Sequence, residues 1–151
     1  MRNDPPVSRD SDFHGNPSEP TTARRILVAE DNLEMRRLLV SCLQRDGYAV
    51  VQAQTGVQLQ DLIGTQLSHA RDRPAVDLII SDVRMPGMSG LQVLEDLRRT
   101  DRSTPVILIT AFGDQETHAE AHRLGAKLVF NKPFDLDDLR MAVEWLTDAP
   151  R

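Results

Sequence analysis

Acidic side chains follow two of the apolar runs in this sequence, at the points where those runs end. Glu30 and Asp31 come after ILVA, and Asp82 comes after DLIIS. Thr110 ends the run PVILIT, and Lys132 comes directly after KLVFN. If the runs are parallel strands, their carboxyl ends lie together at the edge of a sheet where open α/β folds bind ligands. The sequence therefore predicts that these side chains share one crevice.

Carboxylates gathered in one crevice repel each other strongly unless a cation lies among them. A cluster with only oxygen ligands suits Mg²⁺, which keeps several waters and takes one or two carboxylates. Lys132 would add a fixed positive charge, and Thr110 would add a hydroxyl donor. Metal, lysine and hydroxyl around one carboxylate would stabilise a bound phosphoryl group, so these residues indicate phosphoryl chemistry.

Apolar runs that alternate with helical patterns must position these residues. The predicted strands cover residues 26–30, 48–53, 77–82, 105–110 and 127–131. The predicted helices run from the N-cap Asn32 to Gly47, from about 55 to 69, onward from Ser89, from the N-cap Asp114 to Gly125, and from 135 to about 146. This alternation predicts an α/β fold with a parallel sheet covered by helices on both faces.

The spacing of apolar residues also predicts which face of each helix is buried. The first helix would bury Met35, Leu38, Leu39, Cys42 and Leu43, which makes Cys42 a small core residue rather than a reactive thiol. In chain order, the other helices would bury Val57, Leu62 and Ile63; Leu91, Leu94 and Leu97; Ala121 and Leu124; and Leu136, Leu139, Val143 and Leu146. The fourth helix has the fewest of these residues, so it should pack loosely.

Length and composition are those of a single globular domain with a tail. The chain has 151 residues, of which 40% are hydrophobic and 27% charged, enough to bury a core. Residues 1–23 carry four prolines and almost no apolar residues, so we expect them to be disordered. The domain is expected at 24–148, with 149–151 as a short C-terminal end.

Charge and cysteine content exclude several classes. A net charge of −5 argues against direct DNA binding, which relies on clustered Lys and Arg. No run approaches the roughly 20 apolar residues needed to span a membrane. The N-terminus lacks a signal-peptide pattern, and a single cysteine cannot form an internal disulfide. We therefore expect a cytoplasmic protein.

Four short motifs stand at the ends of the predicted strands: AEDN (29–32), DVRMPGMSG (82–90), TAFGD (110–114) and NKPF (131–134). In this order they resemble the receiver domain of two-component response regulators, over roughly residues 24–147. The resemblance implies a flavodoxin-like, doubly wound five-stranded parallel sheet of order 2-1-3-4-5 with five helices. It also implies a phosphorylation-dependent signalling switch rather than an enzyme that turns over an external substrate.

The resemblance implies a role for each acidic residue. Asp82 would be the phosphoacceptor, forming an aspartyl phosphate that is slowly lost by autodephosphorylation. Asp31 and Asp82 would bind Mg²⁺, together with the backbone carbonyl of Arg84. Glu30 would help to hold the ion through water.

The remaining residues of the motifs would handle the phosphoryl group and the switch. Thr110 would be the switch residue, and Lys132 would pair with a phosphoryl oxygen. Auxiliary positions would be Val83, Ala111 and Pro133, and the Lys132–Pro133 bond is expected to be cis.

A receiver implies partners on both sides of the phosphoryl transfer. A sensor histidine kinase or a histidine phosphotransfer protein would be the donor, and a downstream protein target would respond; a homodimer is also possible. Two alternatives stay open: a receiver segment of a larger regulator or hybrid kinase, and a receiver-like binding module that acts without phosphorylation. Phosphatases of the haloacid dehalogenase type, flavodoxins and P-loop proteins are disfavoured, because EDNLEM matches none of their loops.

Some positions depart from the family pattern. Receivers often carry Tyr or Phe three residues before the lysine that Lys132 matches, but this chain has Val129 there. Phe130 should point to the opposite face of the strand, so it would not replace an aromatic switch. Arg84 and Phe112 would flank the phosphoryl group and hinder the hydrolytic water, which predicts a long-lived phosphorylated form.

Two pairs of residues at helical i, i+4 spacing suggest surface functions. Met141 and Trp145 fall on the outer face of the last helix, and with Val129 they are the candidate partner surface. The alternative is a fraying helix with an incidental Trp. His118 and His122 could hold zinc, but no third ligand is evident, which favours two surface histidines.

Overall fold

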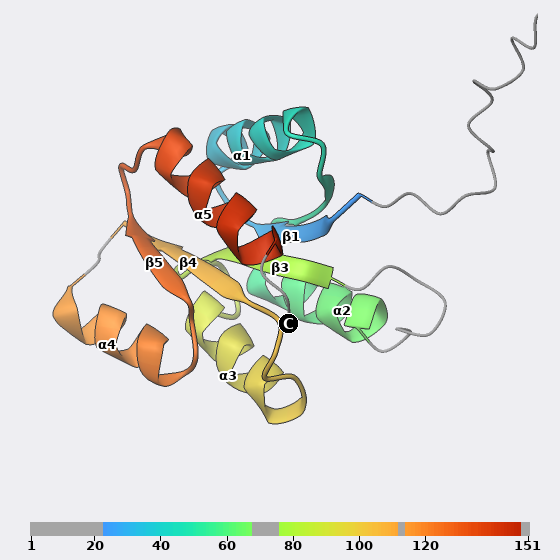
Figure 1. Cartoon of the computed structure of the whole chain (residues 1–151). Coiled ribbons are helices and arrows are strands. Elements are labelled where there is room, and N and C mark those ends of the chain that lie inside the picture. Colours follow the sequence, from blue (N-terminus) through green and yellow to red (C-terminus); the bar gives the residue numbers. More distant parts are fainter. Residues whose placement is uncertain (1–22, 68–75, 112–113, 149–151) are drawn as a thin grey trace, which may run out of the picture.

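The computed structural model describes residues 23–67, 76–111 and 114–148. Apart from Ala23, the tail expected at 1–23 lies outside these ranges, as do residues 149–151, His69 and Phe112. Five strands and five helices alternate along the described chain (Figure 1). In order they are β1 (Arg25–Ala29), α1 (Leu33–Arg45), β2 (Ala49–Ala53), α2 (Gly56–Leu67), β3 (Val76–Asp82), α3 (Gly90–Thr100), β4 (Val106–Thr110), α4 (Gln115–Arg123), β5 (Leu128–Asn131) and α5 (Leu136–Asp148).

The strands form one parallel sheet of order β2-β1-β3-β4-β5, which confirms the predicted fold class. Its register decides which strand ends are neighbours. Ala29 pairs with Ser81, so Glu30, which follows β1, and Asp82, the last residue of β3, come side by side. At the other edge of β4, Thr110 pairs with Asn131.

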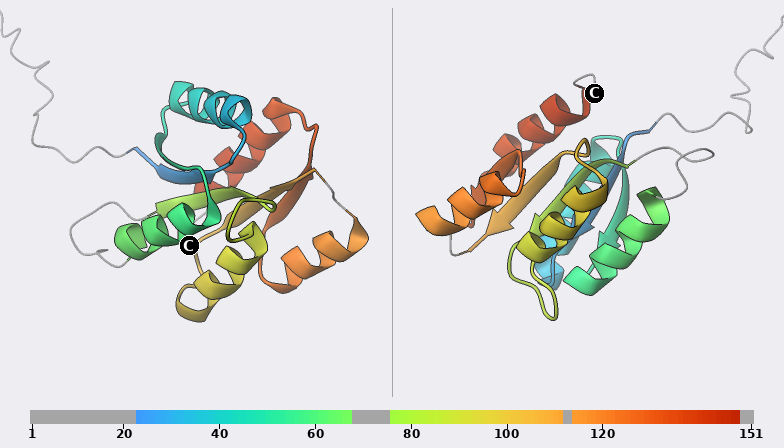
Figure 2. Two further views of the ribbon diagram at one scale, coloured as in Figure 1. Left: turned by 180° about the vertical axis from the view of Figure 1, so that it is seen from behind. Right: turned by 90° about the horizontal axis from the view of Figure 1, so that it is seen from below.

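Helices cover both faces of the sheet (Figure 2). One core lies under α2, α3 and α4, and the other lies under α1 and α5. The central strand β3 contributes to both, because Ile79 packs into the first core and Leu78 and Ile80 into the second. A strand buried on both faces reads as a continuous apolar run, which is why Leu78, Ile79 and Ile80 are all apolar.

The helices begin where their capping residues predict. The side chains of Asn32 and Asp114 accept hydrogen bonds from the backbone N–H groups of Met35 (2.9 Å) and Thr117 (2.8 Å). Ser89 forms a capping box with Gln92. These caps start α1, α3 and α4 close to the site edge of the sheet.

The predicted helix faces are only partly correct. Leu39 and Leu43 of α1 are buried as predicted. Leu38 is 47% exposed and Cys42 is half-buried, whereas Val40, which was not predicted, is buried. The expectation that Val57 points inward is also wrong, since it is 49% exposed and α2 buries Leu59. Several apolar residues at helical spacing do not decide which edge of the stripe meets the sheet.

The last two helices match their predictions more closely. In α4 the one buried residue is Ala121, in line with the loose packing expected. In α5 Leu139, Val143 and Leu146 are buried. Over the described ranges, none of the helices combines the length and apolar character that crossing a membrane requires.

Candidate functional site

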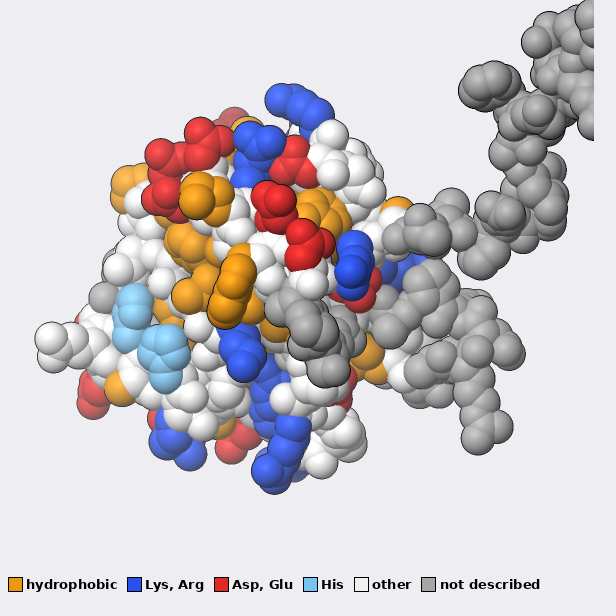
Figure 3. Space-filling view, in the orientation of Figure 1, with side chains coloured by type: hydrophobic (Ala, Val, Ile, Leu, Met, Phe, Trp, Pro, Cys, Tyr) orange, Lys and Arg blue, Asp and Glu red, His pale blue; other side chains and the backbone are white. Residues whose placement is uncertain are grey.

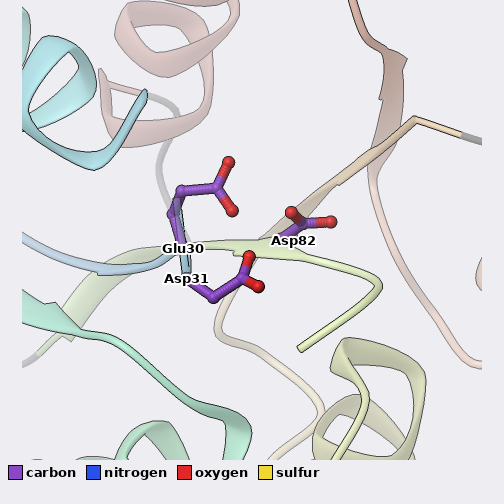
Figure 4. A group of neighbouring side chains, drawn as sticks. All are labelled: Glu30, Asp31 and Asp82. Carbon is purple, nitrogen blue, oxygen red and sulfur yellow. The ribbon is translucent and has the colours of Figure 1, made fainter. Parts of the chain in front are cut away.

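Three carboxylates converge at the carboxyl edge of the sheet (Figure 4). Glu30 and Asp31 follow β1, and Asp82 is the last residue of β3. One oxygen from each lies within 4.8 Å of the others. Glu30 and Asp82 are 1% and 6% exposed, whereas Asp31 is exposed. The cluster therefore has a buried floor and one side open to solvent.

Lys132 lies between the two buried acids. Its Nζ is 2.5 Å from Glu30 Oε1 and 2.8 Å from Asp82 Oδ2. Burial lowers the pKa of Lys132, but hydrogen bonds to Asp82 and Glu30 outweigh this effect and leave the pKa above its ordinary value. The residue is therefore an ammonium ion that joins β5 to both acidic strand ends.

One ammonium does not compensate the whole cluster. Burial, the strongest influence, and the neighbouring Asp82 raise the pKa of Glu30, and Lys132 lowers it; together they leave the pKa at about 7. Glu30 Oε2 is buried and has no hydrogen-bond partner among the described residues. Buried polar atoms are normally satisfied, so this oxygen is available to a further ligand of the site. An oxygen-only donor set with an exposed Asp31 beside it fits Mg²⁺.

The turn after β3 fixes the carboxylate of Asp82. The backbone N–H of Arg84 donates to Asp82 Oδ1 at 3.1 Å, and the N–H of Gly90 donates to Val83 O at 2.8 Å. A Cβ on Gly90 would lie 2.3 Å from Asp82 O, so only glycine lets α3 approach this closely. Gly87 has φ +81, the left-handed region that favours glycine. The glycines of this turn therefore have a geometric role.

Thr110 ends β4 beside Lys132. It is 1% exposed, and its carbonyl accepts a hydrogen bond from the backbone N–H of Lys132 at 2.8 Å. Ala111 and Pro133 are exposed on either side, and the Lys132–Pro133 bond is cis as expected. Val83 is 7% exposed, in contact with the core under α3.

Arg36 is a neighbour of the site that the sequence reasoning missed. It is 6% exposed, and its Nη1 donates to Glu30 O at 2.8 Å. Arg36 belongs to α1 and does not stand at a strand end, so the pattern of strand-end residues does not point to it. A signal existed, because Arg36 stands at i, i+3, i+4 and i+7 spacing with the buried residues Leu39, Val40 and Leu43.

A family model described as the response regulator receiver domain matches residues 26–144. This chain belongs to that family. The predicted resemblance is confirmed, and the family's members are signalling switches of two-component systems.

Two curated relatives illustrate the range of the family. The receiver domain is 35% identical to sporulation initiation phosphotransferase F of Bacillus subtilis over 120 residues, which are 80% of this chain and 90% of that protein. It is 36% identical to the regulatory protein AtoC of Escherichia coli over 124 residues, which are 82% of this chain. The match spans 25% of the length of AtoC.

Solved receiver structures share the fold. The response regulator TrrA of Thermotoga maritima, in complex with Mg²⁺-BeF, matches with 30% identity and a TM-score of 0.69, over 82% of this chain and 98% of that one. A Francisella receiver domain matches with 27% identity and a TM-score of 0.73, over 82% and 96% of the two chains.

The candidate partner surface lies on α5 and β5. Met141 and Trp145 are each 68% exposed, and hydrophobic side chains gather on the face shown in Figure 3, between acidic side chains and histidines.

Val129 is half-buried against the core under α4, and Phe130 packs into the opposite core, where its ring lies 5.9 Å from that of Phe134. The receiver domain thus has no aromatic side chain at position 129.

The two histidines of α4 do not form a metal cluster in the described part of the chain. The group of three possible ligands found there is the acidic one, and it includes neither histidine. His118 Nε2 instead lies 2.9 Å from Asn131 Oδ1, which connects α4 to the end of β5.

Proposed function

We propose that this receiver domain accepts a phosphoryl group on Asp82 in the presence of Mg²⁺ and then changes its contacts with a partner protein. The observation that carries the proposal is the position of Lys132, whose ammonium bridges the buried carboxylates of Glu30 and Asp82 beside the exposed Asp31. If Asp82 only capped the following turn, it would not need Lys132, Glu30 and Asp31 around it.

In the proposed transfer, a carboxylate oxygen of Asp82 forms a bond to phosphorus. The bond from phosphorus to the nitrogen of a phosphohistidine, or to the oxygen of a small acyl phosphate, breaks, and the leaving group keeps the electron pair. Lys132 already contacts Asp82, so its ammonium is positioned to pair with a phosphoryl oxygen as negative charge arrives.

Asp31, Asp82 and the backbone carbonyl of Arg84 would hold Mg²⁺ directly, with Glu30 acting through water. The bound ion would neutralise the phosphoryl oxygens and the crowded carboxylates. The buried, unpartnered oxygen of Glu30 supports this assignment, since an adjacent cation would favour the ionised form of that side chain.

Thr110 is the proposed switch residue. Its hydroxyl stands at the end of the strand next to Asp82, and its carbonyl is joined to the backbone of Lys132. With Val129 in place of an aromatic residue, the response would reach α4 and α5 without an aromatic rotamer change. Val83, Ala111 and Pro133 are the proposed auxiliary positions around these groups.

The proposed phosphoryl donor is a sensor histidine kinase or a histidine phosphotransfer protein, and the output is a downstream protein target. Autodephosphorylation would be slow, and no external substrate would be turned over. Direct DNA binding and membrane insertion are not part of the proposal, homodimerisation is an optional output, and the cytoplasmic location expected from the sequence stays a prediction.

A second candidate is a receiver segment within a larger regulator or hybrid kinase. The match to AtoC favours it, since the matched segment spans 25% of that longer protein. The phosphoryl chemistry would be the same in that case. A binding module without phosphorylation is disfavoured, because Asp31, Asp82 and Lys132 are all present.

The test is the intact mass of the protein after incubation with acetyl phosphate and Mg²⁺. The wild type and the control Asp61→Asn, a change on the exposed side of α2, should each gain one phosphoryl group, and Asp82→Asn should gain none. An adduct on Asp82→Asn, or an unmodified wild type, would overturn the proposal.

A further inference from the structure

Arg36 is a buried cation that has no ion-pair partner among the described residues. It is 6% exposed, and no carboxylate oxygen of the described residues lies within 4.0 Å of its guanidinium. Burial of an unpaired charge is costly, and a well-packed apolar side chain would fit the same helical stripe. Helix positions that face the core are normally apolar, so a charged residue at such a position is a candidate for a functional role.

The guanidinium joins three elements behind the acidic cluster. Its Nη1 donates to the carbonyl of Glu30 at 2.8 Å, and its Nε donates to Gln52 Oε1 on β2 at 3.2 Å. The backbone N–H of Glu30 donates to Ala53 O, also on β2, at 3.1 Å. Glu30 is therefore anchored through the peptide groups on both of its sides.

The contact to the Glu30 carbonyl has a geometric consequence. The peptide group between Glu30 and Asp31 is planar, so fixing its oxygen also fixes its N–H and limits the backbone of Asp31. The turn is closed further by Asn32, whose carbonyl accepts from Arg36 N–H at 2.9 Å. The backbone that carries both acids is thereby fixed beside Asp82.

A comparison with Arg98 separates this arrangement from an ordinary link between elements. Arg98 donates to the carbonyls of Asp101, Thr104 and Gly125, all in loops at the opposite end of the sheet. Arg36 instead donates to the carbonyl of an acidic residue of the candidate site.

We propose that Arg36 is a positioning residue of the magnesium site: it holds the backbone of the Glu30–Asp31 pair in place through the Glu30 carbonyl. This inference rests on the proposed function, since it assumes that the acidic cluster is where Mg²⁺ binds. Residues that orient metal ligands typically change metal affinity by 10- to 100-fold when they are replaced.

The test is calorimetric titration of the whole chain with MgCl₂, which does not depend on phosphorylation. Arg36→Leu should bind Mg²⁺ about 10-fold more weakly than the wild type. Arg37→Leu is the matched control, because Arg37 is the next residue of α1 and is exposed. Arg36→Lys keeps the charge but cannot reach both Glu30 O and Gln52, so its affinity should fall between the other two.

Thermal melting of each variant distinguishes positioning from a purely structural role. A structural role would lower the melting temperature of Arg36→Leu and leave its Mg²⁺ affinity equal to that of Arg37→Leu, which would overturn the inference. If Arg36→Leu does not fold, Arg36→Lys decides: weakened binding supports the inference, and wild-type affinity overturns it.

The inference and the proposed function can fail separately. A wild type that binds Mg²⁺ but gains no phosphoryl group contradicts the proposed function, and the Arg36 variants still test positioning. Phosphorylation of Asp82 with unchanged Mg²⁺ affinity in the Arg36 variants contradicts the inference alone. A wild type that does not bind Mg²⁺ contradicts both.

Discussion

Asp101 and Glu30 are carboxylic acids at opposite ends of the same sheet, and their surroundings move their pKa values in opposite directions. Burial raises the pKa of Asp101, but hydrogen bonds from Thr104 and Ser103 outweigh it and leave the pKa below its ordinary value. Burial of Glu30 raises its pKa to about 7, and Oε2 has no partner among the described residues.

The two acids differ in how many hydrogen bonds their carboxylates accept from neighbouring residues of the sequence. Asp101 Oδ1 accepts from the backbone and hydroxyl of Ser103 and from Thr104 N, and its Oδ2 accepts from the Thr104 hydroxyl at 2.6 Å. Its charge is satisfied within four residues of sequence. Glu30 accepts a hydrogen bond from Lys132 of a distant strand, and its other oxygen has no partner within the described ranges. Asp101 therefore has the pattern of a structural carboxylate, and Glu30 that of a carboxylate in a ligand-binding site.

Removal of Lys132 should produce the largest effect. Lys132→Met leaves the crowded carboxylates without their ammonium and deprives the transferred group of a donor. We expect the rate of phosphorylation by acetyl phosphate to fall about 10²- to 10³-fold, as for other donors that stabilise developing charge. The time course of the mass adduct measures this, with the exposed Lys127→Met as control. Equal loss in both variants would show that position 132 has no special role.

The raised pKa of Glu30 should make the free energy of unfolding depend on pH. Its pKa is about 7 in the folded chain against 4.5 ordinarily, so the folded state holds more protons between these values. Stability from this group is present at low pH and is lost as the pH rises through about 7. In EDTA, the free energy of unfolding of Glu30→Gln relative to the wild type should rise by up to about 3 kcal/mol from about pH 5 to about pH 8. Urea titrations at each pH measure it, and a constant difference would contradict the raised pKa.

Asp101 should show the opposite sign. Its pKa is lowered by folding, so its contribution is present above its unfolded pKa and is lost as the pH falls through the lower folded value. Asp101→Ala should cost about 2 kcal/mol at neutral pH, because several donors lose their charged acceptor. It should leave Mg²⁺ affinity unchanged, and a weakened Mg²⁺ site in this variant would remove the distinction between the two ends.

The smallest effect is expected at the candidate partner surface. Trp145 is 68% exposed, so Trp145→Ala should change the free energy of unfolding by less than about 0.5 kcal/mol. Phosphorylation of Asp82 should proceed as in the wild type. Capture of a partner by phosphorylated protein should weaken, with the exposed Glu116→Ala as control; undiminished capture would remove Trp145 from the surface.

The strands and the strand-end residues could be predicted from sequence because buried parallel strands carry continuous apolar runs. The run predicted at 77–82 is observed as Val76–Asp82, and the convergence of Glu30, Asp31 and Asp82 follows from the parallel order. The roles assigned to these residues stay predictions. The arrangement of these residues does not test whether Asp82 accepts a phosphoryl group or whether the acids bind Mg²⁺.

Helix orientation and the support of the site could not be predicted in the same way. Leu38 and Val57 belong to apolar stripes that are wider than the contact each helix makes, so their exposure depends on packing. The sequence predicted that Lys132 shares a crevice with Glu30, 102 residues away, but not that its ammonium pairs with that side chain. Arg36 was not predicted because a charged residue is expected to be exposed. Its acceptor, the carbonyl of Glu30, is known only from the structure.

The most direct measurement of the central claim is phosphorylation of the wild type by acetyl phosphate, with Mg²⁺ or with EDTA, followed by localisation of the modified residue in peptide fragments. The account predicts one phosphoryl group on Asp82 with Mg²⁺ and none with EDTA. Modification of equal extent in EDTA, or modification of a residue other than Asp82, would contradict it.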